Sequence, residues 1–250
     1  MPGTRATWIG LRRAVLAIFL AVAACGAVFR PAGAVPVDLE LVLAIDVSYS
    51  VDAEEARLQR EGYFAALRHP RVLQAIASGP YRGIAVVYVE WAGSFYQRVV
   101  ADWTLLRGAA DVEAFVARIA AMPTQSASRT SISGAIDFSA ALFDNNGYEG
   151  TRLVIDVSGD GRNNHGRPVT DARDAAVAKG ITINGLPILS GNENFGRPAE
   201  EGLEEHYRED VIGGPGAFVI AAESFAKFTS AVLSKLVREI SGAPTQFAGP

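Results

Sequence analysis

The stretch that decides the fold reads Leu39-Glu40-Leu41-Val42-Leu43-Ala44-Ile45-Asp46. Apart from Glu40 and the final Asp46, every residue in it is apolar. A near-continuous apolar run of this length is typical of a strand buried on both faces, as the strands of a parallel sheet are. We therefore expect Asp46 at the carboxyl end of a buried strand, where open α/β sheets bind their ligands.

Strands and helices alternate along the rest of the chain. Further strands are expected over residues 84–91, 153–158, 181–188 and 217–220, with 96–103 pairing antiparallel to 84–91 at a sheet edge. Helices are expected from residue 52 to before His69-Pro70 and over residues 111–122, 130–143, 171–179, 203–210 and 224–240. The pattern predicts an α/β fold with a doubly wound, mostly parallel sheet, one antiparallel edge strand and helices on both faces. We expect one domain over residues 35–241 and a flexible tail over residues 242–250.

Residues 1–34 have the features of a secretory signal peptide. They contain four arginines and no acidic residue, and 16 uncharged residues separate Arg13 from Arg30. A membrane-spanning helix needs roughly 20 apolar residues, so this run is too short. The small residues Ala32-Gly33-Ala34 predict cleavage after Ala34 and hence an exported protein, periplasmic or secreted. An alternative is lipoprotein processing at Val22-Ala23-Ala24-Cys25, which would leave a lipid anchor at Cys25.

The composition of the chain excludes some classes of protein and some kinds of partner. The 250 residues carry 23 Lys+Arg against 27 Asp+Glu, and 49% are hydrophobic, which fits a globular domain and excludes a disordered chain. Without the leader, 216 residues remain with 19 basic and 27 acidic side chains, a net charge of −8, and no cysteine. This acidic balance argues against nucleic acid as a partner, and the lack of thiols suits an oxidising compartment. No span crosses the membrane in the expected mature chain.

The motif after the first strand points to a metal. Asp46, Ser48 and Ser50 put one carboxylate and two hydroxyls at alternate positions of a tight loop. Thr130, at the entry to a predicted helix, and Asp160, in a glycine-flanked loop after a predicted strand, could meet them at one end of the sheet. Such hard oxygen ligands suit Mg²⁺, Mn²⁺ or Ca²⁺.

This pattern resembles the von Willebrand factor A-type domains, including the inserted domains of integrins. Their metal-ion-dependent adhesion site uses Asp-x-Ser-x-Ser after the first strand, a Thr from a second loop and an Asp from a third. The resemblance implies Ser48, Ser50 and Thr130 as direct ligands of a divalent cation, with Asp46 and Asp160 direct or bridged by water. It implies Mg²⁺ first, with Mn²⁺ and Ca²⁺ as alternatives, and a protein partner that offers a carboxylate to the metal.

The chain departs from the family pattern at three places. Tyr49 stands where a small residue is common, Ser128-Arg129 replaces Gly-Gly, and Ser158-Gly159-Asp160-Gly161 replaces Thr-Asp-Gly. Asp156 is therefore an alternative third ligand, although Asp160 is preferred because Asp156 falls inside a predicted strand. Residues 207–219 and the last helix resemble an uncharacterised family of secreted bacterial proteins, which implies the fold and export but no activity. Further candidates for contact with a ligand are Tyr49, Arg129, Asn163 and His165.

Enzymatic functions fit the sequence less well. A haloacid-dehalogenase-type phosphatase needs a second Asp two residues after the first, and that position is Ser48. The chain has no Gly-x-Ser-x-Gly nucleophile elbow and no phosphate-binding P-loop. We therefore expect a non-enzymatic exported binding domain. The alternatives are a metal-independent scaffold of the cell envelope and a metal-dependent hydrolase.

Overall fold

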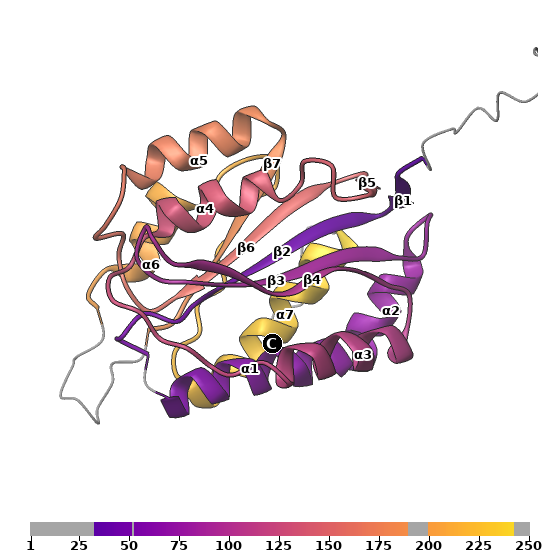
Figure 1. Ribbon diagram of the computed structural model, residues 1–250, viewed down its shortest axis with the longest axis horizontal. Helices are drawn as coiled ribbons and strands as arrows, with labels where there is room; N and C mark the ends of the chain where they lie inside the picture. The colour runs from indigo at the N-terminus through magenta and orange to yellow at the C-terminus, as the bar shows by residue number, and fades with distance from the viewer. Residues whose placement is uncertain (1–32, 52, 190–199, 243–250) are drawn as a thin grey trace, which may run out of the picture. The chain divides into compact units, whose positions relative to one another are not determined.

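A five-stranded sheet with strand order β4-β3-β2-β6-β7 forms the centre of the fold. The computed structural model describes residues 33–51, 53–189 and 200–242 (Figure 1). In it β2 (Leu39–Asp46), β3 (Ile84–Trp91), β6 (Leu153–Gly159) and β7 (Ile181–Pro187) run parallel. The edge strand β4 (Gln97–Leu106) pairs antiparallel with β3. The predicted doubly wound sheet with one antiparallel edge strand is confirmed.

Several predicted features lie outside the described residues. The chain divides after Gly33 into two units, and the second of them contains the sheet. Most of the predicted leader, Cys25, the expected first residue of a helix, Asp52, and residues 243–250 of the expected tail are among the residues not described. None of the helices in the described part is long and apolar enough to cross a membrane.

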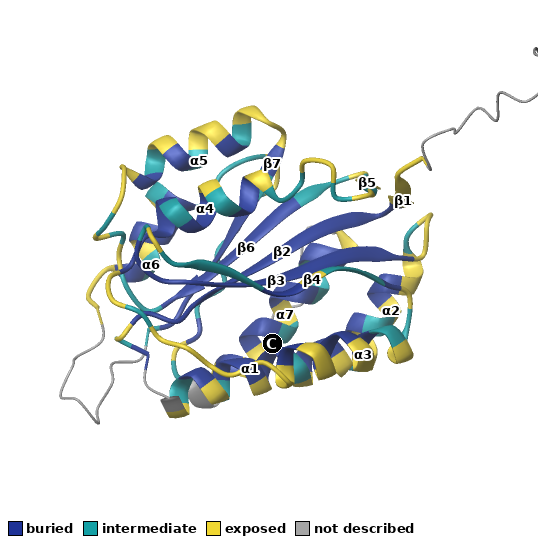
Figure 2. Cartoon of the chain, in the orientation of Figure 1, coloured by how far each residue is buried: buried dark blue, intermediate teal, exposed yellow. Residues whose placement is uncertain are grey.

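Helices cover both faces of the sheet (Figure 1). One face carries α1 (Ala53–Arg68), α2 (Pro70–Ser78), α3 (Ala109–Ala120) and α7 (Phe225–Ser241). The other carries α4 (Ile132–Ala141), α5 (Val169–Ala178) and α6 (Leu203–His206), which continues into a π-helical turn at Tyr207–Val211. Figure 2 shows the consequence for burial: β2 and β3 are buried along their length, β6 and β7 nearly so, the edge strand β4 is mostly half-buried, and the helices expose their outer faces.

The alternation of residues along β2 builds two separate cores. Leu41, Leu43 and Ile45 join the core that contains Phe115 and Phe228, from α3 and α7. Val42 and Ala44 point to the opposite side and join the core that contains Ile132 and Tyr207. Each large apolar side chain buried in this way contributes about 1.5–3 kcal/mol, which explains why an uninterrupted apolar run is needed at the middle of the sheet.

One predicted strand is wrong, and several boundaries shift. Residues 217–220 form no strand, since the chain runs alongside the end of β7 and is joined there by isolated bridges, Gly185 with Val219 and Ile188, just after β7, with Ala222. The helix expected from residue 130 begins at Ile132, because Ser131 is its N-cap and accepts a hydrogen bond from the Gly134 amide (3.1 Å). The helix α2 and a two-stranded parallel sheet of β1 (Val35–Val37) with β5 (Tyr148–Gly150) were not expected.

The winding of the sheet reverses between β2 and β6. The chain adds β3 and β4 on one side of β2, and later adds β6 and β7 on the other. Open α/β sheets bind ligands where the winding reverses, beyond the carboxyl ends of the two strands concerned. Here those ends carry Asp46, the last residue of β2, and Asp160, the residue after β6.

Candidate metal site

A chain of hydrogen bonds joins the ends of β2 and β6. The Ser48 amide donates to Asp46 Oδ1 (2.7 Å), and the Ser48 and Ser50 hydroxyls lie 2.8 Å apart. The Ser50 hydroxyl then donates to Asp160 Oδ1 (2.7 Å), across 110 positions of sequence. Four of the five residues expected to form the site therefore share one network at the carboxyl edge of the sheet.

Thr130 lies at the same edge. It is buried, and its backbone holds the loop after Asp160, because its carbonyl accepts from the amides of Asn164 (2.9 Å) and His165 (3.1 Å). Its Oγ1 lies 3.7 Å from the point that a Cβ on Gly161 would occupy. The side chain of Thr130, with its Cγ2 at 3.8 Å from the same point, therefore faces the loop that carries Asp160.

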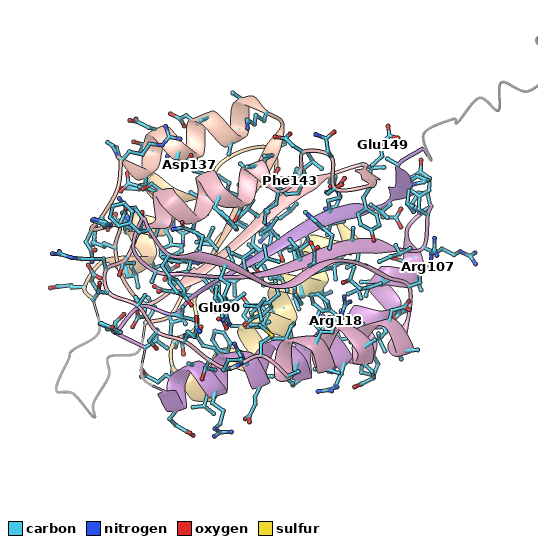
Figure 3. The ribbon with its side chains drawn as sticks, viewed as in Figure 1. Glu90, Arg107, Arg118, Asp137, Phe143 and Glu149 are labelled. Atoms are coloured by element: carbon cyan, nitrogen blue, oxygen red, sulfur yellow. The ribbon has the colours of Figure 1, made fainter. Side chains whose placement is uncertain are left out.

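The loops of the site are tied down by buried contacts. Ser48 forms an isolated parallel bridge with Ala127, which links the Asp46 loop to the segment that precedes Thr130. The earlier part of that segment is held by Arg60 of α1, which donates to the Met122 carbonyl (2.6 Å). Arg60 also pairs with the buried Glu90 (Nε–Oε1 3.1 Å), which is labelled in Figure 3. The donor oxygens are thus held before any ligand arrives.

Burial and a second carboxyl group at this edge both disfavour the charged form of Asp46. Asp46 is fully buried, and this burial raises the pKa of its carboxyl well above the usual range. The charge of Asp160 raises that pKa further, while the hydrogen bonds from Ser48 lower it. Asp46 Oδ2 is buried and accepts no hydrogen bond from the described residues. Such an oxygen is the feature expected where a cation completes the site.

The residue types fit a hard divalent cation. Two carboxylates and three hydroxyls supply only oxygen donors, the preference of Mg²⁺, Mn²⁺ and Ca²⁺. Groups of three or more His, Cys, Asp or Glu side chains arranged for a metal are absent from the described part of the chain. The set at this edge contains two such residues, so a cation here would depend on the hydroxyls of Ser48, Ser50 and Thr130.

Two residues next to Asp46 were not anticipated from the sequence. Tyr207, in the π-helical turn, is fully buried, and its hydroxyl has no partner among the described residues. Burial raises its pKa most, followed by the charges of Asp46 and Asp160. A Cβ on Gly159 would lie 2.8 Å from Asp46 Oδ2 and 3.0 Å from the Tyr207 hydroxyl. Gly159 stands in the Ser158-Gly159-Asp160-Gly161 segment, but neither residue is a ligand in the motif, and no spacing in the sequence indicates that they pack against Asp46.

The alternative third ligand lies apart from this network. Asp156 is buried inside β6, and its carboxylate pairs with the ammonium of Lys235 on α7 (2.6 Å). It is Asp160 that reaches Ser50.

The four residues predicted to contact a ligand differ in their exposure and in how far they are engaged within the protein. Tyr49 is 63% exposed, and Arg129 is exposed with a positive φ of 72°. Asn163 is used within the protein, since it accepts from the Ser133 amide (3.0 Å) and donates to a backbone carbonyl. His165 packs edge-on against Phe95 (centroids 5.4 Å apart), a side chain that is 92% exposed and was not among the candidates.

The fold is that of solved von Willebrand factor A-type domains. The chain resembles proximal thread matrix protein 1 from the mussel byssus, with 15% identity and a TM-score of 0.58. That structure is described as having a zinc-occupied MIDAS motif, and the match covers 83% of this chain and 49% of that one. The pilus adhesin SpaC from Lactobacillus rhamnosus GG gives 15% identity and a TM-score of 0.57, covering 82% and 30%. A von Willebrand factor type A structure from Catenulispora acidiphila gives 12% identity and 0.55, covering 82% and 43%.

These likenesses establish the fold and no more, because the identities are low and the chain spans about half or less of each of these structures. No protein with a curated description matches the sequence significantly. A family model does match, over residues 36–244. The chain therefore belongs to the family described as "Protein of unknown function (DUF1194)", and its fold is that of the von Willebrand factor A-type domains.

Proposed function

We propose that this chain is a non-enzymatic binding domain that holds a divalent cation at the carboxyl edge of its sheet and engages an acidic group on a protein partner through it. The observation that carries the proposal is the Asp46 carboxylate, which is buried, has one oxygen without a hydrogen bond and lies beside a second carboxylate. A protein that needed Asp46 only to accept from the Ser48 amide would gain nothing from its second, charged oxygen.

The oxygens lie close enough together to share one Mg²⁺ ion, although their separations are also those of ordinary hydrogen bonds. Neighbouring oxygens around an octahedral Mg²⁺ lie about 2.9 Å apart, given metal–oxygen distances of about 2.0–2.1 Å. The Ser48 and Ser50 hydroxyls are 2.8 Å apart, and Ser50 is 2.7 Å from Asp160. Mn²⁺ and Ca²⁺ remain alternatives, because the same oxygen donors suit them.

The neutral hydroxyls explain why we expect the partner to offer an acidic group. A bound cation supplies an open position that a carboxylate oxygen can fill. Ser48, Ser50 and Thr130 contribute no charge, so Asp46 and Asp160 alone offset the cation and leave it attractive to a further anion. Tyr49 lies in this loop between Ser48 and Ser50, is exposed, and would contact a partner that approaches the cation.

The metal is tested by isothermal titration calorimetry of the purified chain with MgCl₂ and MnCl₂. We expect binding by the wild type and none by Asp46→Asn, which keeps the shape of the side chain and removes its charge. The metal-free Asp46→Asn protein should also be more stable than the metal-free wild type, since a buried charge is removed. Asp137→Asn is the matched control, because Asp137 forms an exposed ion pair with Arg167. Absence of metal binding, or binding unchanged in Asp46→Asn, would contradict the proposal.

The partner is tested by pull-down from a cell-envelope extract. Capture by the wild type in Mg²⁺ should be lost in EDTA and with Asp46→Asn. Capture that survives both would favour the metal-independent scaffold instead. Turnover of generic phosphoesters by the metal-loaded protein, lost in Asp46→Asn, would favour a hydrolase.

The proposal includes export. Residues 1–34 have the charge pattern and the small-residue end of a secretory leader, and the remaining chain has no cysteine. Mass spectrometry of the protein from its own host distinguishes the two processing routes. A mature chain that begins at Val35 supports cleavage after Ala34, and a lipid-modified Cys25 at its start supports the membrane anchor.

A further inference from the structure

A cavity of about 530 Å³ lies apart from the candidate metal site. It is bounded by the middle of β4, the end of α4, the turn that follows α4, and the small sheet of β1 and β5. None of the five residues expected to hold the metal lines it. Its volume falls within the range of about 300–1,000 Å³ that is usual for small-molecule sites.

An irregularity in the sheet brings two neighbouring side chains of β4 to this cavity. Between Ala101 and Thr104, β4 has two residues where the facing strand β3 has one, so the register between the strands shifts. The two residues are Asp102 and Trp103, and both line the cavity. Such bulges re-aim side chains, and they are frequent at sheet edges and next to active sites.

Trp103 gives the cavity an aromatic wall that is fixed in place. The centroid of its ring lies 5.6 Å from that of Phe143, which is labelled in Figure 3, and 6.4 Å from that of Tyr148. Its Nε1 donates to the Leu142 carbonyl (3.0 Å). The indole is only half-buried despite these contacts, and Tyr148 lines the cavity beside it. The face of an aromatic ring attracts a cation.

The charge of the lining is negative. Asp144 is exposed, and its carboxylate has no hydrogen-bond or ion-pair partner among the described residues. Asp102 is also exposed, and its Oδ1 accepts from the Trp103 amide (2.8 Å). Lys and Arg are absent from the described residues that line the cavity, and the Val35 nitrogen donates to the Gly147 carbonyl (2.8 Å). The described part of the chain therefore supplies no cation for these two carboxylates.

The turn that carries Asp144 is held by a buried acid. Asn146 donates to the carboxylate of Glu40, which is 3% exposed, and accepts from the Tyr148 amide (2.8 Å). Asn145 has a positive φ of 56°, a conformation that asparagine adopts more readily than most residues do. The position of Asp144 opposite β4 is thus set by the fold, before any ligand arrives.

We propose that this cavity binds a small organic ammonium ion, a positively charged nitrogen on a short apolar chain. The nitrogen donates to the carboxylates of Asp102 and Asp144 and lies against the ring of Trp103. The apolar chain packs against apolar lining residues such as Val35, which is 37% exposed. An anion would be repelled by two carboxylates that no basic residue offsets. The site does not depend on the function proposed for the metal edge.

Three probes separate the charge of the ligand from its apolar chain. n-Butylammonium has both, 1-butanol has the chain without the charge, and ammonium has the charge without the chain. In calorimetric titrations of the full chain at low ionic strength, we expect n-butylammonium to bind about tenfold or more tightly than either of the others, because 1-butanol loses the charge-assisted hydrogen bonds and ammonium loses the buried chain. Equal affinities for n-butylammonium and 1-butanol, or for n-butylammonium and ammonium, would overturn the proposal.

Variants of the lining show whether n-butylammonium binds in this cavity. The double variant Asp102→Asn with Asp144→Asn should lose about tenfold or more in affinity, and it should fold normally because both residues are exposed and asparagine still accepts from the Trp103 amide. Glu149→Gln is the matched control, since it removes an exposed carboxylate of the adjacent β5 that does not line the cavity (Figure 3). It should bind as the wild type does.

Two further variants complete the test. Trp103→Leu, with circular dichroism to check its fold, should lose about threefold or more in affinity, because the attraction of the ring for the cation is removed. Asp46→Asn should bind n-butylammonium normally, so this test can fail independently of the metal. No binding of n-butylammonium at millimolar concentration, or an equal loss in Glu149→Gln and in the double variant, would overturn the proposal.

Discussion

Adding a single methyl group at Gly159 should disturb the candidate metal site from within. Gly159 is the last residue of β6, and an added Cβ would lie 2.8 Å from Asp46 Oδ2 and 3.0 Å from the Tyr207 hydroxyl. Its φ is not in the left-handed region, so Gly159→Ala creates no backbone strain of its own. The effect of the substitution therefore comes from contact with the two side chains.

The size of the effect follows from these distances. An ordinary contact needs about 3.4 Å, so Asp46 Oδ2 must retreat by about 0.6 Å, and the Tyr207 hydroxyl by about 0.4 Å. Both side chains are fully buried and cannot move into solvent. Overpacking of this kind costs about 1–3 kcal/mol, which corresponds to a fall in Tm of about 2–12 °C for a domain of this size. Displacement of Asp46 should also weaken Mg²⁺ binding about tenfold or more.

Thermal unfolding followed by circular dichroism gives the Tm, and calorimetry gives the Mg²⁺ affinity. Gly161→Ala is the matched control on the same loop, because its added Cβ would meet nothing closer than Glu200 Oε2 at 3.5 Å and Thr130 Oγ1 at 3.7 Å. We expect the control to stay within about 0.5 kcal/mol of the wild type and to bind metal as it does. If Gly159→Ala matches the wild type in both measurements, the close packing of Asp46 against β6 is refuted.

Three other changes test different parts of the fold. Phe95→Ala should leave the urea-unfolding free energy within about 0.5 kcal/mol of the wild type, since Phe95 is 92% exposed, but should weaken capture of the partner; normal capture would exclude it from the interface. Lys235→Met should cost about 3–5 kcal/mol in the same unfolding assay, because it leaves the buried Asp156 and Glu239 without their cation; a loss below about 1 kcal/mol would contradict this. Burial, and then the charge of Glu239, raise the pKa of Asp156 from 3.8 to about 7, against the opposing effect of Lys235. The protonated form is thus favoured in the folded state, so its contribution to stability is full below pH 3.8 and is lost as the pH rises through about 7. Asp156→Asn should therefore flatten the dependence of the free energy of unfolding on pH over that range. An unchanged pH profile would contradict this.

Patterns of apolar residues were enough to predict the sheet. The run over residues 39–46 is buried on both faces, and the run over residues 153–158 forms a strand, as predicted, which the structure places beside it. The error over residues 217–220 has a physical cause. Val219 and Ala222 touch β7 at single bridges, and Pro215 and Gly216, whose φ is 73°, turn the chain just before them. A short apolar run predicts burial there, but burial at a sheet edge does not require a strand.

The site was predictable only as far as its motif extends. Asp46, Ser48 and Ser50 are close in sequence, and the resemblance supplied Thr130 and Asp160 from distant loops. The neighbours that surround Asp46 depend on tertiary structure, which sequence spacing does not encode. Tyr207 arrives from a π-helical turn, and Gly159 matters because of what lies within 3 Å of it.

Two buried aspartates in the same sheet, Asp46 and Asp156, differ in their charged neighbours, and this difference bears on the proposed metal. Asp156 is fully buried and meets the ammonium of Lys235 at 2.6 Å, so the chain supplies its cation. Asp46 is equally buried and also has a neighbouring acid, Asp160, that raises its pKa, but among the described residues it has no cationic partner of the kind that Lys235 provides for Asp156. An asparagine could accept from the Ser48 amide at the same position without a buried charge. This difference supports the proposal that a cation from solution binds at Asp46, at the end of the sheet where the winding reverses.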